Sequence, residues 1–336
     1  MSRFLHRIGW IGLWLWLAGQ GTPVQAIPAW LRGGTSPVYE ETEPDPGFHL
    51  FNRPEKKDAA SQWAYVLDLQ RAGKTRAAAK QALALRLFWP YAPEAPQAQL
   101  LYARLLEERG HLEESFDAFQ YMVDHYTGRF EFNELIATQR RLAQQVMVAR
   151  HGRFLLLPGF SAPERAIPLF EKIVENAPED PETAGDYVFI GRAHEDNFDY
   201  AEAIEAYFKA MNRFPDSPHA LEAAYRQALC HVRLSDDEPN DQRALATARA
   251  ACVLFLQRHP TSEHREEMQE RIARLSARQA QNDFDLAVYY DRQLKRPTAA
   301  LIAYRTFLER HPGDAHADEA RTRIQQLDAA QKDSRL

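Results

Sequence analysis

Few residues of this sequence stand at spacings that could do chemistry. The best candidate is Gly73-Lys74-Thr75, which resembles the end of a phosphate-binding loop. The glycine that such a loop needs earlier in the motif is replaced by Asp68, and the preceding residues have helical rather than strand spacing. We therefore predict that the triplet is a turn inside a helical hairpin.

Histidines beside acidic residues are the nearest approach to a metal site. His264 precedes Glu267, and His316 precedes Asp318 and Glu319. Such pairs on a helix surface are usually solvated charge, because zinc sites gather three or four ligands. The HExxH and GxSxG motifs are absent. The sequence predicts no catalytic residue, no metal and no cofactor, and it favours a binding or scaffold protein over an enzyme.

Cys230 and Cys252 are the only cysteines, which excludes a disulfide framework and a four-cysteine zinc site. Two interpretations stay open. The favoured one is a pair of small buried apolar side chains. The other is a disulfide between adjacent antiparallel helices in an oxidising compartment.

The elements that position these residues are repeated helices. From Ala59 onward, Ala, Leu, Arg, Glu and Gln dominate at helical spacing. One phrase recurs, in which an apolar helix end is followed by proline and by small or acidic residues that can cap the next helix. Its prolines are Pro90, Pro178, Pro215, Pro260 and Pro312. This self-similarity predicts a helical repeat array.

One segment fits the tetratricopeptide repeat (TPR) pattern almost position for position. Its matching residues are Tyr187, Ile190, Gly191, His194, Ala203, Tyr207 and Pro215. Small residues at two positions are expected where the helices of a hairpin cross. We predict an all-α fold, a right-handed TPR-type α-solenoid of about five to six helical hairpins with a C-terminal capping helix.

Other segments depart from this period. We expect helices over Phe132–Ala149 and Pro163–Asn176 with an irregular link between them, and one long helix or two joined helices over Ser262–Arg292. The polar stretch Ser235–Arg243 is predicted as a loop, and residues 314–327 as the capping helix. N-terminal repeats would span 59–180, C-terminal repeats 181–327 and a polar tail 328–336.

In such an array the first helix of each hairpin, called helix A, lines a groove that suits a peptide in extended or helical form. In the first two repeats the candidate peptide-binding residues are Trp63, Leu67, Arg71, Gln97 and Arg104. The alternative for each of them is an ordinary solvated helix face.

The N-terminal residues 1–26 read as an export signal, with Arg3 and Arg7 before a short apolar run and a small residue, Ala26, suited to cleavage. Residues 27–58 are proline-rich and predicted to be a disordered linker. Removing the signal leaves 39 basic against 47 acidic residues. This acidic balance speaks against nucleic-acid binding.

From about residue 186 to 327 the chain resembles the BamD (YfiO-type) outer-membrane assembly family. The resemblance is carried by EAAYRQALCHVRL, the acidic insertion DDEPNDQR, ALATARAACVLFLQRHPTSEH and the long helix before NDFDLAVYYDRQLKRPTAALIAYRTFLERHP. It implies a non-catalytic periplasmic subunit of the machinery that assembles β-barrel proteins, peripheral to the inner face of the outer membrane. Its implied partners are unfolded outer-membrane protein segments and the POTRA domains of the barrel insertase.

By position, the resemblance implies partner docking around Asp285, Tyr289 and Arg292. Members of the family are normally lipoproteins acylated on a cysteine after a Leu-Ala-Gly-like stretch, but here Gln20 follows Leu17-Ala18-Gly19. We therefore expect cleavage after Ala26 and no lipid. Two alternatives remain, a periplasmic TPR scaffold of the Tol–Pal and cell-division type, and an accessory protein of envelope export.

Overall fold

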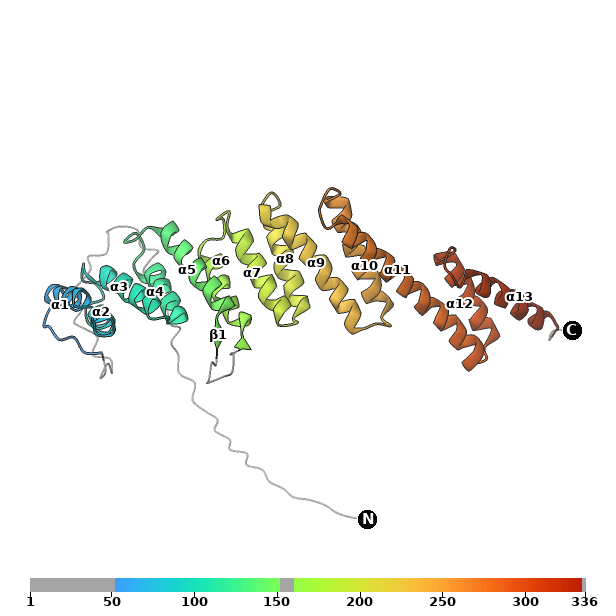
Figure 1. Cartoon of the computed structure of the whole chain (residues 1–336), viewed down its shortest axis with the longest axis horizontal. Helices are drawn as coiled ribbons and strands as arrows, with labels where there is room; N and C mark the ends of the chain where they lie inside the picture. Colours follow the sequence, from blue (N-terminus) through green and yellow to red (C-terminus); the bar gives the residue numbers. More distant parts are fainter. Residues whose placement is uncertain (1–51, 152–159, 334–336) are drawn as a thin grey trace, which may run out of the picture. The chain divides into compact units, whose positions relative to one another are not determined.

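A computed structural model describes residues 52–151 and 160–333 (Figure 1). The chain divides into two units, Met1–Glu43 and Pro44–Leu336, and every described residue belongs to the second. The expected signal segment, Gln20, the cleavage site after Ala26 and most of the expected linker lie outside the described residues.

Helices make up most of the described chain. They are α1 (Ala59–Arg71), α2 (Thr75–Phe88), α3 (Ala95–Glu108), α4 (Leu112–His125), α5 (Phe132–Val148), α6 (Ile167–Asn176), α7 (Thr183–Asp196), α8 (Tyr200–Arg213), α9 (Pro218–Asp237), α10 (Gln242–Arg258), α11 (Arg265–Val288), α12 (Pro297–Arg310) and α13 (Ala317–Asp333). Each packs against the next, so the described helices form six hairpins followed by α13. This arrangement confirms the predicted all-α TPR-type solenoid, with α1 to α11 (odd numbers) as helices A and α2 to α12 (even numbers) as helices B.

The hairpin α7–α8 explains why the TPR pattern needs a small residue at its centre. A Cβ atom on Gly191 would lie 2.4 Å from Cε1 of Tyr207. Tyr207 is fully buried, and its hydroxyl donates a hydrogen bond to Glu195 at 2.9 Å. Only glycine lets the α7 backbone approach the Tyr207 ring this closely.

Three segments differ from the sequence predictions. Helix α9 continues through Ser235, which is buried and donates to the carbonyl of Val232 at 2.7 Å, so the insertion loop is shorter than predicted. The final helix begins at Ala317 rather than residue 314, and it continues to Asp333. The link predicted as irregular contains two short strands, β1 (Arg150–His151) and β2 (Phe160–Ser161), which pair antiparallel.

Buried side chains form three main clusters along the chain. The first runs from α1 to α9, the second joins α9, α10 and α11, and the third joins α11, α12 and α13. Helix α11 contributes Met268 and Leu275 to the second cluster and Phe284 and Ala287 to the third. The expected long helix is thus one helix, followed by a π-helical turn at Tyr289–Gln293.

The first hairpin also holds the end of the expected linker. The backbone N–H groups of Glu55 and Lys56 donate to Oε1 of Gln62 at 3.1 and 3.0 Å, and Asp58 caps α1 by accepting from the N–H of Ser61. Residues 53–58 therefore contact α1 and α2.

Candidate functional site

A hollow lies between two neighbouring helices A, α3 and α5. Its lining residues come from α3, α4, the α4–α5 turn and α5, and they are Leu100, Arg104, Glu107, Phe119, Phe130, Glu131, Glu134, Leu135, Thr138 and Arg141. Phe119 and Leu135 are buried and form its floor. The charged residues surround this floor, as expected for a site that takes an apolar side chain on a polar backbone.

The charges of the hollow are arranged across it. Arg141 on α5 forms an ion pair with Glu107 on α3, so the two walls are joined. Arg104 is exposed and forms no ion pair with any described residue. Its guanidinium is therefore available for a carboxylate or a peptide carbonyl of a ligand.

The turn between α4 and α5 brings Phe130 to the hollow. Gly128 has φ +78°, a left-handed conformation that favours glycine. The N–H of Arg129 donates to the carbonyl of Tyr126 at 3.0 Å, which closes the turn. Tyr126 is in turn fixed by its hydroxyl, which donates to the carbonyl of Pro90.

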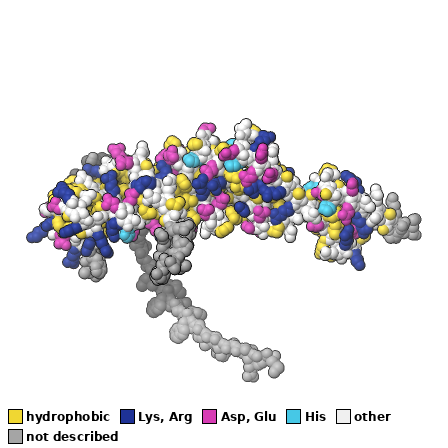
Figure 2. Space-filling model, in the orientation of Figure 1, with side chains coloured by type: hydrophobic (Ala, Val, Ile, Leu, Met, Phe, Trp, Pro, Cys, Tyr) yellow, Lys and Arg dark blue, Asp and Glu magenta, His cyan; other side chains and the backbone are white. Residues whose placement is uncertain are grey.

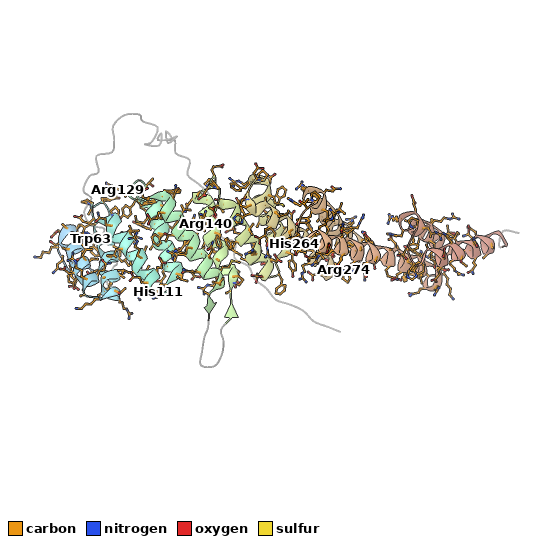
Figure 3. The ribbon with its side chains drawn as sticks, turned by 45° about the horizontal axis from the view of Figure 1, so that its top comes forward. Trp63, His111, Arg129, Arg140, His264 and Arg274 are labelled. Carbon is orange, nitrogen blue, oxygen red and sulfur yellow. The ribbon has the colours of Figure 1, made fainter. Side chains whose placement is uncertain are left out.

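Helix α5 is held in place by a buried ion pair with the next helix A. Arg140, labelled in Figure 3, donates to both carboxylate oxygens of Asp186 on α7, at 2.7 and 2.8 Å. The Asp186 side chain is fully buried, and Asp180 lies 3.5 Å from the same guanidinium. This bidentate contact fixes the wall that carries Glu134 and Arg141.

The five candidate peptide-binding residues predicted from the sequence do not lie together in the structure. Arg104 lines the hollow. Trp63, labelled in Figure 3, is half-buried on α1 and packs against the first cluster, and Leu67 is also half-buried. Arg71 is exposed and pairs with Asp68 of its own helix at 2.9 Å, and Gln97 is exposed near the start of α3. The hollow thus gathers one of the five.

Sequence reasoning missed the α5 side of the hollow. The sequence predicts the helix Phe132–Ala149 as a departure from the repeat period, so no residue of α5 is among the predicted site residues. Glu131, Glu134, Thr138 and Arg141 follow each other at spacings of three and four, which places them on one face of a helix. Recognising Phe132–Ala149 as the helix A of a third repeat would have identified this face.

The predicted partner-docking residues lie at the end of α11 and in the π-helical turn that follows it. Asp285 is exposed and accepts a hydrogen bond from Gln281 at 2.9 Å. Tyr289 is 43% exposed, and two nearby apolar side chains are exposed to a similar degree, Leu286 (48%) and Leu294 (39%). Arg292 donates to Glu319 of α13 at 3.0 Å. Exposed apolar residues beside charges suit a protein contact.

Gly73 and the two cysteines, which could have taken part in chemistry, lie in a turn and in the buried core. Gly73 has φ +67° and lies in the turn between α1 and α2, as predicted. Cys230 and Cys252 are buried free thiols, and burial raises their pKa to about 12 and about 11, which disfavours the nucleophilic thiolate. Within residues 52–151 and 160–333, no three potential metal-ligating side chains lie together.

None of the helices in the described part of the chain combines the length and the apolar character needed to cross a bilayer. Figure 2 shows basic and acidic side chains interspersed on the visible face.

Helical hairpins packed in series, with a hollow on the helix A side, define a TPR protein, and a tetratricopeptide repeat model matches residues 66–129. A second family model, YfiO (outer membrane lipoprotein), matches residues 164–331. Because this match covers half of the chain, the protein belongs to the YfiO family.

A curated relative is the outer membrane protein assembly factor BamD of Caulobacter vibrioides, which is 26% identical over 159 residues. The alignment covers 47% of this chain and 52% of the relative, so the chain spans about half the length of the curated relative it matches.

Solved structures with a similar trace are also TPR proteins. The C-terminal part of a TPR repeat-containing protein from Cytophaga hutchinsonii is 15% identical with a TM-score of 0.32, covering 79% of this chain and 88% of that one. A tetratricopeptide repeat protein from Parabacteroides merdae is 10% identical with a TM-score of 0.28, covering 80% and 98%. Because both TM-scores are low, the family assignment rests on the sequence models.

Proposed function

We propose that this protein is a non-catalytic periplasmic TPR scaffold of the machinery that assembles β-barrel proteins in the outer membrane. The observation that carries the proposal is the YfiO match over residues 164–331, supported by the similarity to a BamD assembly factor. The protein would be peripheral to the inner face of the outer membrane.

The hollow between α3 and α5 is the proposed client site. An unfolded barrel strand alternates apolar and polar side chains, so one apolar side chain can enter over Phe119 and Leu135 while its neighbours meet Arg104 and Glu134. The exposed end of α11, with Leu286, is the proposed docking site for the POTRA domains of the barrel insertase.

Site-specific photocrosslinking in cells tests both sites. A photoreactive residue at position 104 is expected to capture unfolded barrel segments, and one at position 289 is expected to capture the insertase. The matched control is Arg249, an exposed residue of α10, which should capture neither. Capture of Tol or peptidoglycan-linked proteins at these positions, without the insertase, would contradict the proposal and favour a Tol–Pal type scaffold.

The mature N-terminus belongs to the same proposal. We expect the exported protein to begin after Ala26 and to carry no lipid, since Gln20 has no thiol to acylate. Mass spectrometry of the protein purified from the envelope checks this. A lipid adduct or a start at Met1 would contradict it.

A further inference from the structure

A second groove lies on the helix B side, away from the helices that form the proposed client and docking sites. It runs between α6 and α8 over α7. Its lining residues are Glu171, Val174, Glu175, Tyr187, Ile190, His194, Glu202, Glu205, Ala206 and Lys209. We call it the acidic groove.

The floor of the acidic groove is apolar. Val174, Tyr187, Ile190 and Ala206 are each between 4% and 9% exposed, so they form a packed surface under the charged walls. Such a floor can cover the aliphatic part of an incoming side chain, which is how the long stems of lysine and arginine are commonly buried.

The walls carry uncompensated negative charge. Glu205 pairs with Lys209 at 2.8 Å, and Glu175 pairs with Lys172 at 2.8 Å. Glu171 on α6 and Glu202 on α8 form no ion pair with any described residue, and both are exposed. Two carboxylates thus face the groove from opposite walls, and a positive group between them would meet both.

One buried nitrogen atom of the groove has no hydrogen-bond partner among the described residues. Nδ1 of His194 is buried and makes no hydrogen bond within the described chain, and it lies 3.8 Å from the Asp199 carboxylate. The charged groups around the groove are four glutamates and Asp199 against Lys209 and Lys172. The balance favours a cationic ligand.

The turn between α7 and α8, two of the helices that line the groove, carries an exposed aromatic residue. The α7–α8 turn joins the helix ends that carry His194 and Glu202, and it contains Phe198, which is 77% exposed. Phe198 has φ +66°, a conformation that Gly73 and Gly110 adopt in the corresponding turns of the first two hairpins. A bulky side chain in this conformation costs free energy, and here it gains little burial in return, since its ring has only an edge contact with Tyr200.

We propose that the acidic groove binds an extended segment of a partner protein that presents lysine or arginine next to an apolar residue. The cation lies between Glu171 and Glu202, its aliphatic stem lies on Ile190 and Ala206, and the apolar neighbour contacts Phe198. The groove shares no lining residue with the hollow between α3 and α5 or with the end of α11, so it can be occupied together with either.

Fluorescence anisotropy with a labelled peptide of alternating lysine and leucine tests the proposal on the full mature chain. We expect Glu171→Lys combined with Glu202→Lys to weaken binding about tenfold or more, since two attractive charges become repulsive. The control Glu270→Lys with Glu309→Lys makes the same charge change at exposed residues of α11 and α12 and should leave the affinity within about twofold. Equal losses in both variants would overturn the proposal.

Phe198→Gly separates binding from folding. Glycine is compatible with the left-handed conformation, so we expect the unfolding temperature not to fall while the affinity for the peptide decreases. A photoreactive residue at position 205 of the otherwise unchanged chain should capture the lysine peptide, but not a peptide with glutamate in place of lysine. Capture of both peptides alike, or unchanged affinity of Phe198→Gly, would overturn the proposal, and neither outcome bears on the client site.

Discussion

The contact between Gly191 and Tyr207 shows how one missing side chain sets the spacing of a hairpin. We expect Gly191→Ala to lower the free energy of unfolding by about 1–2 kcal/mol, because overpacking of a buried ring exceeds the gain in helix propensity. The ring cannot move away easily, since it is fully buried and its hydroxyl is bonded to Glu195. Thermal unfolding measures the effect.

Gly313→Ala is the matched control for this substitution. A Cβ atom on Gly313 would meet nothing within 4 Å, so its unfolding temperature should be almost unchanged. Gly313 lies in the turn between α12 and α13, so equal effects of the two substitutions would show that the contact with the Tyr207 ring does not determine the result.

Asp291 is the residue whose protonation should matter for the C-terminal helices. Arg323 donates to both of its carboxylate oxygens at 2.5 and 2.9 Å, and Tyr304 donates at 3.3 Å. The hydrogen bonds from Arg323 lower the pKa of Asp291 below its ordinary value. Because the pKa is lower in the folded state, this contribution to stability is present above about pH 4 and is lost as the pH falls through the folded pKa.

Asp291→Asn should therefore destabilise the protein by about 2 kcal/mol at pH 7, and the difference from the unchanged protein should shrink below about pH 4. Unfolding followed by circular dichroism across the pH range measures both curves. A difference that stays constant down to pH 2 would contradict the role of the carboxylate charge.

At the scale of elements, α13 closes the third cluster. Ala320 is fully buried there, beside Phe284 and Phe307, whereas Ala329 of the same helix is exposed. Ala320→Glu should release α13, since an unpaired charge cannot be buried without a cost of several kcal/mol. Limited proteolysis should then cleave within α13, and Ala329→Glu should leave the cleavage pattern unchanged.

The helices that the sequence predicted correctly are those whose ends carry strong local signals. The prolines after α8 and α10 and the cap Ser217 of α9 mark chain reversals that any context would respect. The sequence predicts the end of α9 too early because Ser235 and the acidic residues after it suggest a loop. Only the burial of Ser235 within α9, with its hydrogen bond to the carbonyl of Val232, shows that the helix continues. The α3–α5 hollow was found only in part, because contacts between repeats are not visible in a local pattern.

At the scale of the molecule, the described residues pack into three main clusters in series and a small fourth one in the first two hairpins, so stability should be local. Phe307→Ala removes a fully buried ring from the third cluster, at a cost of about 3–5 kcal/mol. Hydrogen exchange should then quicken in α12, α13 and the end of α11, while α2 to α8 keep their protection. Uniform acceleration along the chain would show one cooperative unit instead.

The self-similarity of the sequence made the class of fold predictable. Several copies of one pattern are a strong signal even when each copy matches the pattern only in part. The division of the buried residues into three clusters was not predictable, since it depends on which face of α9 and α11 meets which neighbour. The acidic groove was likewise invisible in the sequence, where Glu171 and Glu202 stand a full hairpin apart.

Helix α11 has a mechanical consequence. Between Leu275 and Ala280 it passes from one cluster to the next over residues that are not fully buried, and at 24 residues it is about 36 Å long. If the proposed docking applies a force at Tyr289, that force reaches α9 and α10 through the bending of α11 as one continuous helix. The bending stiffness of the helical turn around Ala277 would then determine how far a displacement at one end of α11 moves its other end.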